Sequence, residues 1–128
     1  MLPPNAQEAS ALEARIVALR IARSLKGAPY RWGAAGPDAF DCSGLTQYAY
    51  RKAGKRIPRT AAAQFYATRR ITAQQRKPGD LVFFPRFGTI GHVGLYAGNG
   101  SIWHAPRPGG HVRREHLWTR HVEYHAVR

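Results

Sequence analysis

The spacing of hydrophobic positions changes along the chain, from a helical period at its start to short extended runs later. Residues 1–25 are predicted to form an N-terminal helix after a short lead, because one buried face can be built from Ala9, Leu12, Ile16 and Leu19. Asn5 or Ser10 can cap this helix, since each is followed three residues later by glutamate. Gly27 is expected to end it.

Two more helices are predicted before the extended runs begin. One runs from Cys42 to Ala53 and stops at Gly54. The other is short, covers residues 61–66 and has Thr60 as a plausible N-cap. A loop rich in glycine, proline and aromatic residues joins the first two helices.

Short strands separated by turns are predicted in the second half of the chain. Their expected ranges are 81–84, 92–97, 101–105, 112–117 and 121–127. Helices that precede strands indicate an α+β fold, in which the N-terminal helices pack on an antiparallel sheet of about five strands. The length of 128 residues fits a single domain that covers residues 1–128.

Asn99-Gly100 is a strong signal for a hairpin turn. If these two residues alone form the loop, His104 pairs with Leu95 and lies on the opposite face from His92. If the loop holds one more residue, His104 pairs with Gly94 and the two histidines share a face. A joint role for the histidines requires the second register.

The composition restricts the possible partners. The net charge of +13 favours association with polyanions such as nucleic acid, acidic lipid or an anionic cell-wall polymer. The basic residues form no run typical of a nucleic-acid-binding arm, so no specific nucleic-acid partner is expected. No stretch approaches the roughly 18 apolar residues of a membrane span. The first residues lack the features of a secretory leader, which leaves a cytosolic, trimmed or otherwise exported chain open.

Cys42 is the only cysteine, which excludes an internal disulfide and a thiolate-rich zinc site. It is predicted at a helix N-terminus, where free N–H groups and the helix dipole stabilise a thiolate. Cys42 is therefore a candidate nucleophile. The alternative is a small buried side chain without chemistry. Asp41, directly before it, equally fits a helix N-cap.

A cysteine nucleophile needs a base, for which histidine is suited by its pKa near neutrality. His92 and His104, on consecutive predicted strands, are the candidates. Surface or edge-strand positions are expected for His111, His116, His121 and His125. Their spacing matches no standard zinc-ligand pattern, so no metal site is expected.

Several segments resemble, in order, motifs of the NlpC/P60 family of cell-wall cysteine peptidases, which have a papain-like α+β fold. The segments are residues 29–33, 40–45, 57–60 with Gln64, 78–84, 91–96 and 102–106. The resemblance covers about residues 26–126. It implies that Cys42 is the nucleophile, His92 the general base and His104 the residue that orients His92.

The resemblance also implies a substrate site and a reaction. The substrate site is lined by Tyr30, Asp41 and Ser43, with the Tyr30 hydroxyl near the oxyanion, and Arg59 is a candidate to meet a substrate carboxylate. The implied reaction is hydrolysis of peptidoglycan stem peptides, commonly at the D-γ-glutamyl-diaminopimelate bond, through a thioester and without a cofactor. A monomeric protein, secreted or associated with the bacterial cell wall, is expected, with anionic wall polymers as further partners.

Two other interpretations remain open at this point. A papain-like fold also suits an amidase or an acyltransferase, which attack other bonds with the same nucleophile. A non-enzymatic domain that binds polyanions through its charge would not depend on Cys42 and would bind in a strongly salt-dependent way.

Overall fold

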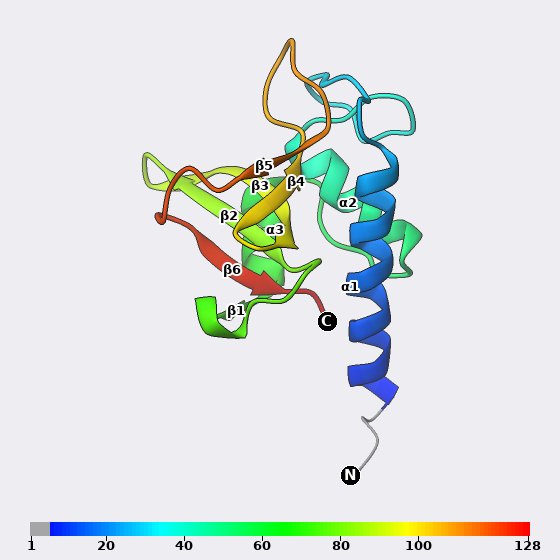
Figure 1. The fold of residues 1–128 in the computed structure, drawn as a ribbon, viewed down its shortest axis with the longest axis vertical. Helices are drawn as coiled ribbons and strands as arrows, with labels where there is room; N and C mark the ends of the chain where they lie inside the picture. The colour runs from blue at the N-terminus through cyan, green and yellow to red at the C-terminus, as the bar shows by residue number, and fades with distance from the viewer. Residues whose placement is uncertain (1–5) are drawn as a thin grey trace.

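The computed structural model describes residues 6–128, with side chains from residue 10 on, and places helices before strands (Figure 1). The helices are α1 (Ala6–Ser24), α2 (Cys42–Lys52) and α3 (Ala61–Ala67), and a 3₁₀ turn, η1, covers Ala73–Gln75. The strands are β1 (Arg69–Ile71), β2 (Leu81–Arg86), β3 (Thr89–Gly98), β4 (Ser101–His104), β5 (Arg113–His116) and β6 (Glu123–Ala126).

The strands form one antiparallel sheet in the order β1-β6-β2-β3-β4-β5. The predicted α+β class is confirmed, and each of the five predicted strands has a counterpart among β2 to β6. The sheet has a sixth strand, β1, which the sequence analysis missed. Its three residues are mostly exposed and show no apolar alternation, because β1 only extends the sheet beside β6.

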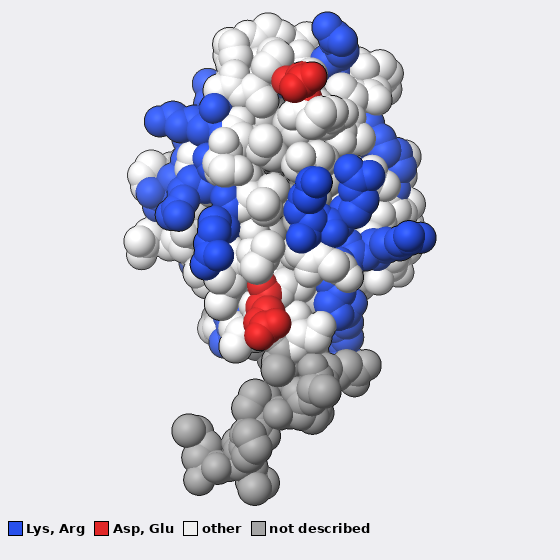
Figure 2. Space-filling view, turned by 90° about the vertical axis from the view of Figure 1, so that its right-hand side faces the viewer, with Lys and Arg blue, Asp and Glu red and all other residues white. Residues whose placement is uncertain are grey.

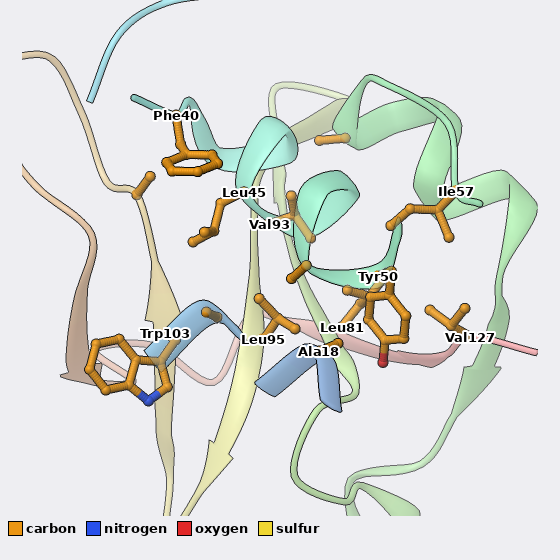
Figure 3. Close-up of a cluster of buried hydrophobic side chains, with 14 of the residues drawn as sticks. Ala18, Phe40, Leu45, Tyr50, Ile57, Leu81, Val93, Leu95, Trp103 and Val127 are labelled. Carbon is orange, nitrogen blue, oxygen red and sulfur yellow. The ribbon is translucent and has the colours of Figure 1, made fainter. Parts of the chain in front are cut away.

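One face of the sheet carries all three helices. The alternation of side chains along β2 and β3 directs Leu81, Phe83, Val93 and Leu95 to this face. Figure 3 shows the helix-side core that results, in which the sheet residues meet Ala18, Leu45, Tyr50 and Ile57. Tyr50 is buried, and its hydroxyl donates a hydrogen bond to the carbonyl oxygen of Gly79, so its polar end is satisfied.

The opposite face of the sheet carries a second, smaller apolar cluster: Val82, Phe84, Tyr96, Ile102 and Tyr124. Side chains from the segments beside the strands cover it, among them Leu117 and Val122. The residues of β2 are therefore buried on both faces, which explains why residues 81–84 read as a continuous apolar run.

The predicted buried face of α1 is wrong for Leu12 and Ile16, whereas Leu19 packs, partly buried, against the helix-side core. Leu12 and Ile16 are 43% and 47% exposed, whereas Ala14, Ala18 and Ala22 are buried. These alanines recur every four residues and let α1 approach α2, β3 and β4 closely, so the smaller side chains define the contact.

The predicted caps of α1 have different outcomes. The helix already includes Ser10, so Ser10 is not its N-cap. Asn5 lies outside the described residues. Within residues 6–128, no helix combines the length and hydrophobicity needed to cross a lipid bilayer.

The packing of α1 predicts opposite responses from its two faces. We expect Ala18→Leu to lower the free energy of unfolding by about 1–3 kcal/mol, because the added atoms overpack a side chain that is 0% exposed. Ile16→Ala, the matched control on the outer face, should change it by less than about 0.5 kcal/mol. Urea titrations followed by circular dichroism measure both. A larger loss for Ile16→Ala than for Ala18→Leu would contradict the observed orientation of the helix.

Candidate active site

Cys42 is the first residue of α2, and the residue before it caps the helix. The Asp41 backbone is extended, and its Oδ1 accepts a hydrogen bond from the Gly44 N–H at 2.7 Å. A Cβ atom at Gly44 would overlap the carbonyl oxygen of Ala34. The loop before the helix therefore packs directly on its first turn, which requires glycine at this position.

The Asp41 carboxylate joins three segments of the chain. Arg59 binds it bidentately, with Nη2 2.7 Å from Oδ2 and Nη1 3.0 Å from Oδ1, and the Gly33 N–H donates to Oδ2 at 3.0 Å. Burial alone would raise the pKa of Asp41. The bonds and charge of Arg59, together with the backbone donors, outweigh burial and hold this pKa below its ordinary value. Asp41 is thus a fixed anion beside the thiol.

The segment after α2 is braced against the same turn. Arg59 Nη1 also donates to Ser43 Oγ at 3.1 Å. Gln64 is fully buried, donates to the Ser43 carbonyl at 3.0 Å and accepts from Thr46 Oγ1 at 2.8 Å. The guanidinium of Arg59 is therefore engaged by the protein itself, in contrast to its suggested contact with a substrate carboxylate.

The Cys42 thiol meets β3 beyond the point where the pairing of β3 with β4 ends. The pairing of these strands ends at Leu95↔Trp103. The Tyr96 N–H bonds on the β2 side, so the alternation of the backbone directs the Val93 N–H toward β4. Beyond the last pair, this N–H is directed at the Cys42 thiol and lowers its pKa, and Cys42 packs against the helix-side core to which Val93 belongs. The thiol thus lies against β3, beside the residue that follows His92.

The expected depression of the thiol pKa is wrong for the free protein. Burial raises the pKa of Cys42, and the negative charge of Asp41 raises it further. Hydrogen bonds from Val93 and Ser43 lower it but do not compensate. A helix N-terminus favours a thiolate only when desolvation is small.

His92 and His104 share a face and contact each other. The register of β3 and β4, in which Leu95 pairs with Trp103, sets His104 opposite Gly94 one position beyond the last pair, which confirms the second of the two registers considered. The turn remains the tight Asn99-Gly100, and a bulge between Tyr96 and Gly98 supplies the extra residue. His92 Nε2 lies 2.8 Å from His104 Nδ1.

Burial keeps both imidazoles neutral. It lowers the pKa of His92 to about 3, with a further contribution from His104. It also lowers the pKa of His104, which is 1% exposed, although Glu115 offsets part of this effect. Phe84 and Trp118 stack on each other with centroids 5.0 Å apart and lie against His92 and His104 respectively. The aromatic rings thus cover one side of the pair.

Glu115 was missed in the sequence analysis. Its Oε1 lies 2.8 Å from His104 Nε2 and accepts hydrogen bonds from Arg113 Nε and Nη2 at 3.2 and 3.0 Å. β5 pairs His104 with Arg113, so Glu115, two residues further on, shares the face of the histidines. The register of this second hairpin could have indicated Glu115, but its longer turn leaves that register undetermined in the sequence.

Tyr30 completes the surroundings of Cys42. Burial raises the pKa of Tyr30, the charges of Cys42 and Asp41 raise it further, and Arg59 lowers it. An isolated bridge joins Tyr30 to Phe40, which places the segment of Tyr30 beside Asp41 and Cys42. The residues predicted to line a substrate site, Tyr30, Asp41 and Ser43, are therefore brought together around Cys42.

The remaining histidines divide into two groups. His111, His116 and His121 are exposed, as expected. His125 is buried at 3% exposure, contrary to the prediction, because β6 lies between β1 and β2 and directs it against Phe65 and Phe83. Among the described residues, no group of three or more histidine, cysteine or acidic side chains is arranged to hold a metal ion.

This arrangement can support acyl transfer. It combines a thiol, a neutral imidazole that can accept a proton, and hydrogen-bond donors at a helix start. An open pocket of about 600 Å³ adjoins the histidine pair, and its lining includes Arg86, Arg107, Glu115 and Trp118. Cys42 does not line it, so this pocket meets the site from the histidine side.

Known proteins similar in sequence to this chain carry related names. A "Probable endopeptidase p60" of Listeria monocytogenes is 52% identical over 83 residues, which are 65% of this chain and 17% of that protein. "Murein DD-endopeptidase MepH" of Escherichia coli is 41% identical over 91% of this chain and 47% of its own length. The chain thus spans less than half of either relative.

Solved structures agree with these similarities. The structure of the peptidoglycan hydrolase RipB from Mycobacterium tuberculosis superposes with a TM-score of 0.80 at 32% identity, over 100% of this chain and 72% of that one. The NlpC/p60 domain of the peptidoglycan hydrolase SagA superposes with a TM-score of 0.79 at 32% identity, over 89% of this chain and 98% of that one. The model of the NlpC/P60 family matches residues 27–128, and the chain belongs to this family.

Proposed function

We propose that this chain is a cysteine endopeptidase of peptidoglycan. The observation that carries the proposal is the meeting of the Cys42 thiol with β3 directly beside the hydrogen-bonded pair of His92 and His104. Family membership supports it, because relatives in the family are named endopeptidases and peptidoglycan hydrolases.

The proposed reaction proceeds through a thioester. His92 takes the proton of Cys42 as the sulfur attacks the substrate carbonyl, and a tetrahedral oxyanion forms. The imidazolium of His92 then donates this proton to the leaving amine, and the C–N bond breaks. Water, deprotonated by His92, attacks the thioester and releases the acyl group and the thiol. His104 orients His92 throughout.

Electrostatic support for the oxyanion comes from the helix start and from Tyr30. The Gly44 N–H donates to the Asp41 carboxylate, and the Leu45 N–H donates to the Asp41 carbonyl. The N–H groups of Cys42 and Ser43 precede these bonds and have no partner within the helix. The Tyr30 hydroxyl lies close enough for the charge on Cys42 to affect its pKa. We assign Asp41 and Ser43 to the substrate-facing wall, where the bonds of Arg59 hold them in place.

The bond that is cleaved defines two candidates. The D-γ-glutamyl-diaminopimelate bond of the stem peptide is our first assignment. The 41% identity to a protein named a DD-endopeptidase favours the cross-link between stem peptides as the second. Digestion of muropeptides of known structure and mass spectrometry of the fragments distinguish the two, and they also reveal amidase or acyltransferase products by their different termini.

The charge of the molecule suits a location at the cell wall. Figure 2 shows lysine and arginine side chains gathered on both flanks of the face that α1 occupies, separated by a mostly uncharged strip that carries acidic side chains near its upper and lower ends. Anionic wall polymers are attracted to such a surface. We propose that the protein acts outside the cell or in association with the wall, as a monomer.

Loss of the nucleophile tests the proposal directly. We expect Cys42→Ala to reduce release of peptides from purified sacculi to background, since no other thiol is present in the chain. His92→Asn should have the same effect, whereas His111→Asn, at an exposed histidine, should leave activity unchanged. Turnover retained by Cys42→Ala would refute the peptidase assignment and favour a charge-driven binding domain.

The protonation states predict the pH dependence of thiol alkylation. The pKa of Cys42 is raised by burial, and a His92 pKa of about 3 leaves no imidazolium partner at neutral pH. We expect the rate of reaction with iodoacetamide to keep rising with pH beyond the ordinary cysteine pKa of about 8.5. Mass spectrometry of the alkylated chain gives the rate. A plateau that extends to mildly acidic pH would instead indicate a preformed thiolate–imidazolium pair.

The proposed role of Tyr30 is tested by removal of one oxygen atom. Tyr30→Phe should lower kcat by a factor on the order of 100 with little change in KM, because the hydroxyl stabilises charge that develops only in the transition state. Tyr66→Phe is the matched control, since Tyr66 is 83% exposed on α3. Equal activities of the two variants would assign Tyr30 a packing role.

A further inference from the structure

Glu115 extends the histidine pair into a chain of three hydrogen-bonded side chains. His104 contacts His92 through Nδ1 and Glu115 through Nε2, each at 2.8 Å. His104 itself is 1% exposed, so both of its nitrogens depend on these partners. The mechanism proposed above uses His92 and His104 but assigns no role to the carboxylate.

The carboxylate determines where the protons lie. An ionised carboxylate only accepts hydrogen bonds, so His104 must carry its proton on Nε2 and donate it to Glu115. In the neutral ring, Nδ1 of His104 is then a bare acceptor. His92 must therefore carry its proton on Nε2 and donate it to His104. Its Nδ1 is left unprotonated, which is the state a base needs.

We infer that Glu115 is a positioning residue that sets the tautomer of His92 through His104; this inference rests on the proposed peptidase function. Arg113 fixes the carboxylate in turn, since its Nε and Nη2 both donate to the oxygen that His104 contacts. The relay runs from β5 through β4 to β3 and follows the register of the sheet.

The charge of Glu115 contributes as well as its geometry. When His92 takes the proton of Cys42, a cation forms in a buried place. The charged groups that face His104 are Arg113 and Arg107, whose charges disfavour such a cation, and Glu115, which favours it. At His92, the charge of His104 lowers the pKa and so disfavours the cation, whereas the charge of Glu115 raises the pKa and favours it. Glu115 is thus the anion that compensates the imidazolium.

A surface ion pair between Glu115 and Arg113 is the simpler alternative. The two side chains are 35% and 42% exposed, and exposed pairs contribute little to stability. That alternative predicts a negligible effect of Glu115 on the histidines. The two interpretations therefore differ in a property of His92 and His104 that can be measured without substrate.

The test compares Glu115→Gln and Glu115→Ala with Glu123→Gln, which alters another strand carboxylate paired with an arginine. Ring ¹⁵N NMR of the free protein should show His92 and His104 protonated on Nε2. Glu115→Gln keeps an oxygen acceptor, so these tautomers should persist while kcat falls about 10- to 100-fold with KM nearly unchanged. Glu115→Ala removes the acceptor and should shift both rings from this pattern. Glu123→Gln should match the parent in both readouts.

Unaltered ring signals in Glu115→Ala, or kcat of Glu115→Gln within twofold of Glu123→Gln, would overturn the inference. Either result is distinct from failure of the proposed function, which is marked by turnover in Cys42→Ala. The ring signals are recorded without substrate, so they report on Glu115 even if the substrate assignment is wrong. Circular dichroism of each variant confirms that the fold is intact.

Discussion

The ion pair of the Asp41 carboxylate with Arg59 is the interaction on which the rest of the site depends. The carboxylate accepts hydrogen bonds from the Gly33 N–H in the preceding loop and from the Gly44 N–H in the first turn of α2. It also accepts a hydrogen bond from Arg59, in the segment that follows α2. These contacts fix the position of the adjacent Cys42 without involving the sulfur itself. The guanidinium of Arg59 keeps the Asp41 carboxylate ionised. The negative charge of Asp41 in turn raises the pKa of the adjacent Cys42 thiol, in addition to the effect of burial.

Burial keeps both the Cys42 thiol and the His92 imidazole neutral in the free protein. Burial disfavours the charged forms of both Cys42 and His92, so the proton stays on the sulfur until a substrate is bound. In the proposed reaction the two charges form together, and nearby groups that favour each of them are already in place. The N–H of Val93 favours the thiolate, and the carboxylate of Glu115, acting through His104, favours the imidazolium. Preorganised dipoles of this kind stabilise charge without reorganisation during the reaction.

Local signals in the sequence were sufficient for much of the fold. Glycines, turn residues and apolar runs located α2, α3 and the five longer strands, and the alternatives for the Asn99-Gly100 hairpin included the observed register. Tertiary contacts decided the rest. The buried face of α1 was misjudged because close packing selects alanine over leucine. The short β1 gains its partners only from β6, and Glu115 reaches His104 through a register that a long turn does not specify.

The segment of β3 beyond its pairing with β4 lies between the thiol and the histidines. The sulfur reaches it from the helix layer, whereas His92 belongs to the face opposite the helices, because it pairs with Phe84 of the second apolar cluster. The thiol of Cys42 thus belongs to the helix layer and the imidazole of His92 to the sheet, and each has its own supporting residues. Substitutions among the residues around Cys42 can accordingly change the substrate site without altering the hydrogen-bonded chain of His92, His104 and Glu115. The early end of the pairing between β3 and β4 allows the two layers to meet at this point.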